Sequence, residues 1–352
     1  MKEDLLNNIL VAASVNIEMA VKDGELFHNP SPLKRILRPE EFSFSIAGSS
    51  CNVARTIKRA GIESVKLIAT IGDDAIGRLI ANELAMEEID VFPLHWRDSS
   101  NVSVNVVVND HNGNGVFTRS HNRKGSYLPD RLGHEHARIT TEVRKTNPRF
   151  RVGTGVQLMD VSIIDTLFGS VTDDDGKLIC STNVLNPGVS LLSPDSTSSE
   201  AESHRQRELK KLLQKTNLLV LNQFEEAELY QSLGISSIIE LRHWSGNQEL
   251  EMIVTRDQHG AIYRNHGDAE DCSIPACYVP DVVDATGAGD CFLGNFIAQR
   301  VRGADVPSAM QFAAAAAALS VRRLGASNPP TLEETQTFLN SYIGTTCPTP
   351  RV

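Results

Sequence analysis

The run at 283–294, which reads VDATGAGDCFLG, constrains this chain more than any other segment. Gly287 and Gly289 let the backbone turn sharply and let a ligand come close to bare amides. The apolar residues that follow predict a helix, whose first turn offers unpaired N–H groups and a positive dipole end to a phosphate. Asp290 would repel that phosphate as a ligand, but as a base it could take a proton from a hydroxyl held beside it. The alternative is a glycine-bearing loop capped by an aspartate.

Composition sets the class of protein. The 352 residues are 41% hydrophobic and 22% charged, as in ordinary globular proteins. The net charge of −10 argues against a general nucleic-acid binder. The six cysteines contain no CxxC pair, which argues against a zinc or thioredoxin-type site and favours reduced thiols. The acidic start MKED and the lack of a membrane-length apolar run predict a cytoplasmic protein without a membrane partner.

The N-terminal part alternates short apolar runs with amphipathic stretches, the order of a parallel α/β sheet. The runs at 9–13 and 65–70 predict buried strands. Residues 52–60 predict a helix ended by Gly61, and residues 76–88 predict a second helix. Four apolar residues of this second helix are expected to face inward: Ile76, Leu79, Ile80 and Leu84.

The same alternation continues to the C-terminus. Residues 218–221 and 252–255 predict strands. Residues 307–323, with six consecutive alanines, predict a close-packed helix, and the TLEE at 331–334 is a capping box that opens a last helix. The Ser-, Asp- and Glu-rich stretch at 190–207 predicts a solvent-exposed insertion.

A second, smaller sheet is predicted beside this one. Residues 102–108 alternate in polarity like a half-buried strand, and the turn at 110–115 leads to a returning strand at 116–119. Together with 13–21 and 35–46 they predict a small antiparallel sheet outside the parallel one.

Three ordered motifs carry a family resemblance. The run at 283–294 resembles the second signature of the ribokinase-like, or PfkB, carbohydrate kinases. Their first signature appears as AGSSCNVA at 47–54, and their Asn-x-x-Glu element as NQFE at 222–225. The resemblance implies one α/β ribokinase-like kinase domain over 1–352. It would have a central, mostly parallel sheet flanked by helices, and a small β-sheet lid from about 13–46 and 100–121.

The resemblance also implies roles for the residues of these motifs. Asp290 is the expected general base, and the amides of Gly287, Ala288 and Gly289 form the expected anion hole for the transferring phosphoryl group. The nucleotide and Mg²⁺ are expected at Asn222, Thr255, Gly260 and Thr286, with Glu225 and Asp284 near the metal. For Asn222 and Glu225 a purely structural explanation stays open, because Asn-x-x-Glu also fits a helix cap and a first-turn acid.

The acceptor side is expected at Asn16, Glu18, Gly48 and Asn52. Glu18 stands where ribokinase-like enzymes often carry an aspartate that holds sugar hydroxyls. It could equally be an exposed acid at a strand end. An Asn52 amide can both donate to and accept from hydroxyls, or it could cap the helix that it opens.

Several positions depart from the family pattern. The first glycine of the Gly-Gly pair is Ala47, and the lysine common in ribokinases is Ser49. The glutamate expected after Gln157-Leu158 is Met159. The middle glycine of the Thr-x-Gly-x-x-Gly element is Asp257, an acid expected near the nucleotide phosphates. These departures argue against ribose itself as the substrate.

The predicted function is therefore an ATP-dependent sugar kinase that transfers the γ-phosphoryl group to a primary hydroxyl. Two alternatives stay open: a nucleoside kinase of the same fold, and a catalytically weak sugar-binding regulatory protein. The expected cofactors are ATP and Mg²⁺, and the resemblance leaves room for a monovalent cation such as K⁺. It also leaves room for a homodimer formed through the lid, and the expected ligand is a small sugar or nucleoside.

Overall fold

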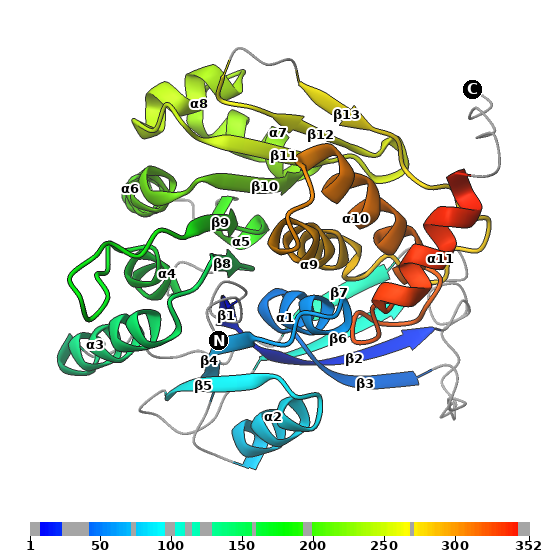
Figure 1. Cartoon of the computed structure of the whole chain (residues 1–352), viewed down its shortest axis with the longest axis horizontal. Coiled ribbons are helices and arrows are strands. Elements are labelled where there is room, and N and C mark those ends of the chain that lie inside the picture. Colours follow the sequence, from blue (N-terminus) through cyan, green and yellow to red (C-terminus); the bar gives the residue numbers. More distant parts are fainter. Residues whose placement is uncertain are drawn as a thin grey trace.

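The computed structural model describes residues 8–22, 42–71, 75–95, 103–109, 115–119, 129–156, 160–192, 199–267 and 271–343. Its centre is a nine-stranded sheet (Figure 1). In spatial order the strands are β13 (Cys272–Ile274), β12 (Ala261–Arg264), β11 (Glu251–Thr255), β10 (Leu218–Asn222), β9 (Thr182–Asn186), β8 (Phe150–Thr154), β1 (Ile9–Ser14), β4 (Val65–Ile71) and β5 (Asp90–His95). The strands from β11 to β5 are all paired in parallel, whereas β12 is antiparallel to both of its neighbours, β11 and β13. The predicted fold class is confirmed.

Helices cover both faces of this sheet, which is why its central strands are apolar on both sides. In β1, Ile9 and Val11 belong to one core, whereas Leu10 and Ala12 belong to the other. The first core is covered by α1 (Ser49–Arg59), α2 (Ala75–Met86), α9 (Ala288–Val301) and α10 (Val306–Ser320). The second is covered by α3 (Pro129–Thr146), α4 (Val161–Leu167), α5 (Val189–Leu192), α6 (Ser199–Lys215), α7 (Gln223–Leu233) and α8 (Ile238–Ser245). The last helix, α11 (Leu332–Ile343), packs on the outside of α10.

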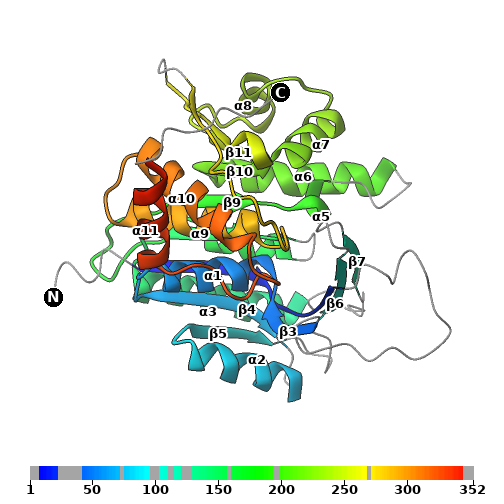
Figure 2. The same ribbon diagram turned by 90° about the vertical axis from the view of Figure 1, so that its right-hand side faces the viewer.

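A small four-stranded sheet stands at one end of the large one (Figure 2). Its order is β3 (Phe42–Ala47), β2 (Asn16–Lys22), β6 (Ser103–Asn109) and β7 (Gly115–Arg119). Only Val15 separates β1 from β2, and only Gly48 separates β3 from α1. The small sheet therefore begins at the carboxyl end of β1 and leads directly into the start of α1.

Two details of this sheet differ from the prediction. The pairing of β2 with β6 is parallel, so the small sheet is mixed and not purely antiparallel. Residues 13 and 14 still pair with β4, and so they belong to the large sheet. The parallel pairing is possible because β6 reaches the sheet from a distant part of the chain, without a hairpin to set its direction.

Two further expectations were wrong. Ile80 and Leu84 are buried in α2, but Ile76 and Leu79 are 38% and 39% exposed. This helix covers β5, the edge strand, so only one narrow stripe of it meets the core. The stretch at 190–207 is not an exposed insertion throughout, because α6 begins at Ser199 and buries Arg205.

The close packing of α1 against α9 sets the geometry of the site. A Cβ atom on Gly294 would lie 2.6 Å from Cβ of Thr56, so only glycine lets these two helices approach so closely. The alanine-rich middle of α10 packs on α9 from the other side. None of the helices in the described ranges is long and apolar enough to cross a membrane.

Candidate active site

The loop before α9 is held by a buried carboxylate. Oδ1 of Asp284 accepts the amide of Thr286 at 2.9 Å, and Oδ2 accepts the amide of Gly325 at 2.8 Å. The amides of Val283 and Asp284 both donate to the carbonyl oxygen of Val321. The segment that follows α10 therefore fixes the shape of the loop, and sequence analysis missed this segment.

Helix α9 then starts without a side-chain cap, although the amide of Ala288 donates to the carbonyl oxygen of Ala285 at 3.2 Å. Its N-cap is Gly287, with φ 76°, which is left-handed backbone that favours glycine. A Cβ atom there would lie 2.4 Å from Cβ of Ala326, whereas one on Gly289 would meet no described atom within 4 Å. No described side chain caps α9. Such a helix start attracts an anion, which matches the role expected for 287–289.

Asp290, in the first turn of α9, meets Asn52 from α1. Nδ2 of Asn52 donates to Oδ2 of Asp290 at 2.8 Å. Asn52 is only 5% exposed, and its buried Oδ1 accepts no hydrogen bond from the described residues. It does not cap α1, because Gly48 occupies the N-cap. The two signatures, 238 residues apart, thus meet with a spare buried acceptor beside the carboxylate.

The backbone gives the positions of the other residues that the sequence predicts on the acceptor side. Gly48 has φ 104° and links β3 to α1. Asn16 pairs with Ala47, and Glu18 pairs with Ser45. Since Asn16 and Glu18 are two residues apart in β2, they share one face of the small sheet. The side chains of Asn16 and Glu18 lie outside what the structure describes.

Three of the residues expected on the nucleotide side, Asn222, Thr255 and Gly260, lie at or shortly after the carboxyl ends of β10 and β11. Asn222 pairs with Thr255 across these strands. The side chain of Asn222 accepts the amides of Phe224 and Glu225, and Oε2 of Glu225 accepts the amide of Asn222, each at 2.9 Å. The capping box left open by the sequence is therefore formed. Glu225 is 7% exposed, and burial raises its pKa while the Asn222 amide opposes that rise.

The described residues differ in how well they suit Mg²⁺. No group of three or more His, Cys, Asp or Glu in the described ranges is arranged to hold a metal. Mg²⁺ needs no such cage, because it keeps several waters and commonly takes one or two carboxylates with nucleotide phosphates. Glu225 fits that donor set. Asp284 fits it poorly, because both its oxygens accept backbone amides.

The loop after β11 completes this side of the site. Gly260 has φ 85°, and a Cβ atom there would lie 2.0 Å from the carbonyl oxygen of Ile274, so only glycine fits. Asp257 also has a positive φ, of 47°, and its Oδ2 accepts Nε2 of Gln223 at 2.7 Å. Asp257 therefore faces the first turn of α7. Nothing in the sequence pattern pointed to Gln223.

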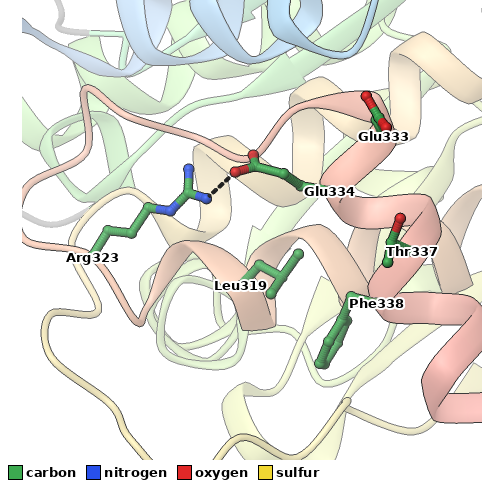
Figure 3. A pocket seen from close by; sticks show the side chains of 6 residues that line it. All are labelled: Leu319, Arg323, Glu333, Glu334, Thr337 and Phe338. Atoms are coloured by element: carbon green, nitrogen blue, oxygen red, sulfur yellow. Dashed lines mark hydrogen bonds and ion pairs between the residues drawn. The ribbon is translucent and has the colours of Figure 1, made fainter.

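A separate hollow of about 420 Å³ lies between α10 and α11 (Figure 3). Arg323 and Glu334 form an ion pair of 2.8 Å across it, over Leu319 and Phe338. None of the predicted site residues lines this hollow.

The doubly covered sheet, the small sheet at its end and the start of α9 beside a carboxylate define a ribokinase-like protein. A family model described as pfkB family carbohydrate kinase matches residues 7–132 and 189–333, which is most of the chain. The chain belongs to this family, and it is a ribokinase-like kinase of the sugar and nucleoside kinase class. The matched ranges contain all the predicted site residues.

Three distant relatives match over nearly the whole chain. The ribokinase of Schizosaccharomyces pombe is 23% identical over 354 residues, covering 95% of this chain and 98% of the relative. A Burkholderia thailandensis nucleoside kinase, solved with inosine, has a TM-score of 0.68 at 19% identity and covers 96% of this chain and 99% of its own. An E. coli protein assigned as a ribokinase II, solved with ATP and Mg²⁺, has a TM-score of 0.71 at 19% identity, with 95% and 99% covered.

Proposed function

We propose that this chain is an ATP-dependent sugar kinase that transfers the γ-phosphoryl group to a primary hydroxyl. One observation carries the proposal: Asn52 holds Asp290 at the amide end of α9 and keeps a buried acceptor of its own. A carboxylate there can take the hydroxyl proton while the helix amides stabilise the developing charge on the phosphoryl group.

In this proposal, different elements bind the acceptor, the transferring phosphoryl group and the nucleotide. Asn52, Gly48 and the small-sheet residues Asn16 and Glu18 orient the acceptor, and Asp290 receives its proton. Gly287, Ala288 and Gly289 bind the transferring group. Asn222, Thr255, Gly260 and Thr286 surround the nucleotide, with Glu225 toward Mg²⁺. When bound, Mg²⁺ neutralises charge on the nucleotide phosphates.

A nucleoside acceptor is the second candidate. The inosine complex of the B. thailandensis relative supports it, since that chain has the same fold. A purely regulatory sugar-binding role is a weaker candidate, because the Asn52–Asp290 pair is intact. A monovalent cation and a homodimer through the small sheet stay predictions.

Phosphoryl transfer from ATP–Mg²⁺ to a panel of pentoses, hexoses, sugar acids and nucleosides tests the proposal. A thermal-shift series with the same compounds, with and without nucleotide, reports binding independently of turnover. We expect one sugar to be both phosphorylated and stabilising. Stabilisation by a compound that is never phosphorylated would instead indicate a binding protein.

The first prediction concerns Glu225. Its raised pKa means that folding favours the neutral form, so this group stabilises the fold at low pH and loses that contribution as the pH rises through its folded pKa. Glutamine also completes a capping box. We therefore expect Glu225→Gln without Mg²⁺ to be at least as stable as wild type at pH 7. The difference should shrink toward about pH 4.3, the ordinary glutamate range.

The same variant should need about 10-fold more Mg²⁺ for half-maximal transfer. Thermal melts from pH 4 to pH 8 and a Mg²⁺ titration measure both effects. Glu334→Gln is the matched control, because Glu334 completes the capping box of α11 with Thr331. The Thr331 amide and then Arg323 lower its pKa, so this control should lose stability at pH 7. Unchanged Mg²⁺ dependence in Glu225→Gln would contradict the metal assignment.

The second prediction concerns Asp257. A carboxylate about 4–6 Å from a nucleotide phosphate repels it, and after solvent screening we expect a cost of about 1 kcal/mol, or fivefold in affinity. Asp257→Gly should therefore tighten ATP binding. Asp257→Asn removes only the charge, because its side-chain oxygen can still accept the hydrogen bond from Gln223. It should therefore show part of the same gain in ATP affinity at low salt. Calorimetry at two ionic strengths measures this, and equal or weaker ATP binding by Asp257→Gly would refute it.

A further inference from the structure

Arg55 is a buried cation that the proposed reaction does not use. It lies on α1 one turn after Asn52 and is only 4% exposed. Its Nε and Nη2 atoms donate to the two carboxylate oxygens of Glu87, the latter at 2.7 Å. Its Nη1 atom donates to the carbonyl oxygen of Ile46 at 2.8 Å. A planar guanidinium thus satisfies a bidentate carboxylate and a backbone acceptor at once.

The carbonyl of Ile46 lies at the root of the small sheet. Ile46 is the penultimate residue of β3, the edge strand that pairs only with β2 in that sheet. A second donor from α1, the Sγ atom of Cys51, lies 3.9 Å from the same oxygen. Burial raises the pKa of Cys51 to about 11, so the thiol is neutral and can donate. Two side chains of α1 therefore donate hydrogen bonds to the end of β3.

Glu87 connects Arg55 to the large sheet through α2. It follows the end of α2, the helix that covers β5 at the edge of the large sheet. Arg55 therefore joins the small-sheet root, α1 and the α2 end. Since Asn52 on the same helix donates to Asp290, the position of β3 is linked to that of the base through one turn of α1.

We propose that Arg55 is a positioning residue that holds the root of the small sheet in register with the Asn52–Asp290 pair, so that an acceptor bound under that sheet meets the base. The proposal rests on the proposed kinase function. Arg55 touches neither substrate nor nucleotide in this role. Its loss should therefore affect the acceptor and leave ATP untouched.

Arg55→Lys is the central test. Lysine keeps the positive charge, but its single ammonium group cannot donate to both carboxylate oxygens of Glu87 and to the carbonyl oxygen of Ile46 at the same time. We expect the acceptor KM to rise about 10-fold, the ATP KM to stay within twofold, and amide hydrogen exchange at 42–47 to quicken about 10-fold. Glu87→Gln changes a partly exposed residue and should fold readily. In this variant the acceptor KM and the exchange rate at 42–47 should each rise about threefold, and the ATP KM should again stay within twofold.

Arg151→Lys is the matched control. Arg151 is a similarly buried arginine, on β8, that donates to the carbonyls of Leu167 and Gly169. Its replacement should lower Tm but leave the acceptor KM and the exchange at 42–47 unchanged. The proposal is overturned if Arg55→Lys and Glu87→Gln behave like this control. If wild type phosphorylates no acceptor, the proposed function fails, and the exchange rates still decide whether Arg55 holds β3.

Discussion

Replacing Asp290 by Asn is expected to lower kcat for phosphoryl transfer by roughly 10²–10⁴-fold. The amide cannot take the proton of the acceptor hydroxyl, but its oxygen can still accept the Asn52 hydrogen bond that Asp290 receives at 2.8 Å. Acceptor and ATP affinities should therefore stay within about threefold of wild type. Steady-state transfer assays and calorimetry measure the two quantities.

The matched control is Asp305→Asn. Asp305 caps α10 by accepting the amide of Ser308 at 2.8 Å, and asparagine caps a helix equally well. This variant makes the same chemical change away from the proposed base, and it should keep wild-type turnover. If Asp290→Asn keeps more than about a tenth of wild-type kcat, Asp290 is not the base.

Gly287→Ala is expected to lower the free energy of unfolding by about 2–4 kcal/mol and to abolish most transfer. Alanine at φ 76° is strained, and its Cβ atom would lie 2.4 Å from Cβ of Ala326. Relief of that clash must move the start of α9 or the loop that holds Asp284. Chemical denaturation and the transfer assay report the two effects.

Gly289→Ala separates stability from catalysis. Gly289 lies inside the first turn of α9, and its Cβ atom would meet no described atom within 4 Å. Alanine should therefore raise helix stability by about 0.5 kcal/mol. If the phosphoryl group binds at this helix start, the new methyl group should still lower kcat by at least about tenfold. A Gly289→Ala variant that is stabilised and fully active would contradict the anion-hole assignment.

The sequence by itself determined the fold class and the family. The alternation of apolar runs with amphipathic stretches is local information, because a strand buried on both faces is a short continuous apolar run, whereas the apolar residues of a one-sided helix recur every three or four positions. The motifs at 47–54 and 283–294 are also local, since each sets a tight turn into a helix start. Their family match is confirmed over most of the chain. The site roles predicted from them await the variants above.

Only the tertiary structure decided how polar groups pair across the chain. In the folded chain both side-chain oxygens of Asp284 accept backbone amides, one of them from Gly325. It also brings Asn52 to Asp290 and joins Arg55 to Glu87 and Ile46. No sequence period encodes such contacts, because they depend on which helices lie side by side. The exposure of Ile76 and the parallel pairing of β6 with β2 also depend on the tertiary structure, because the whole fold sets the position of each strand in its sheet.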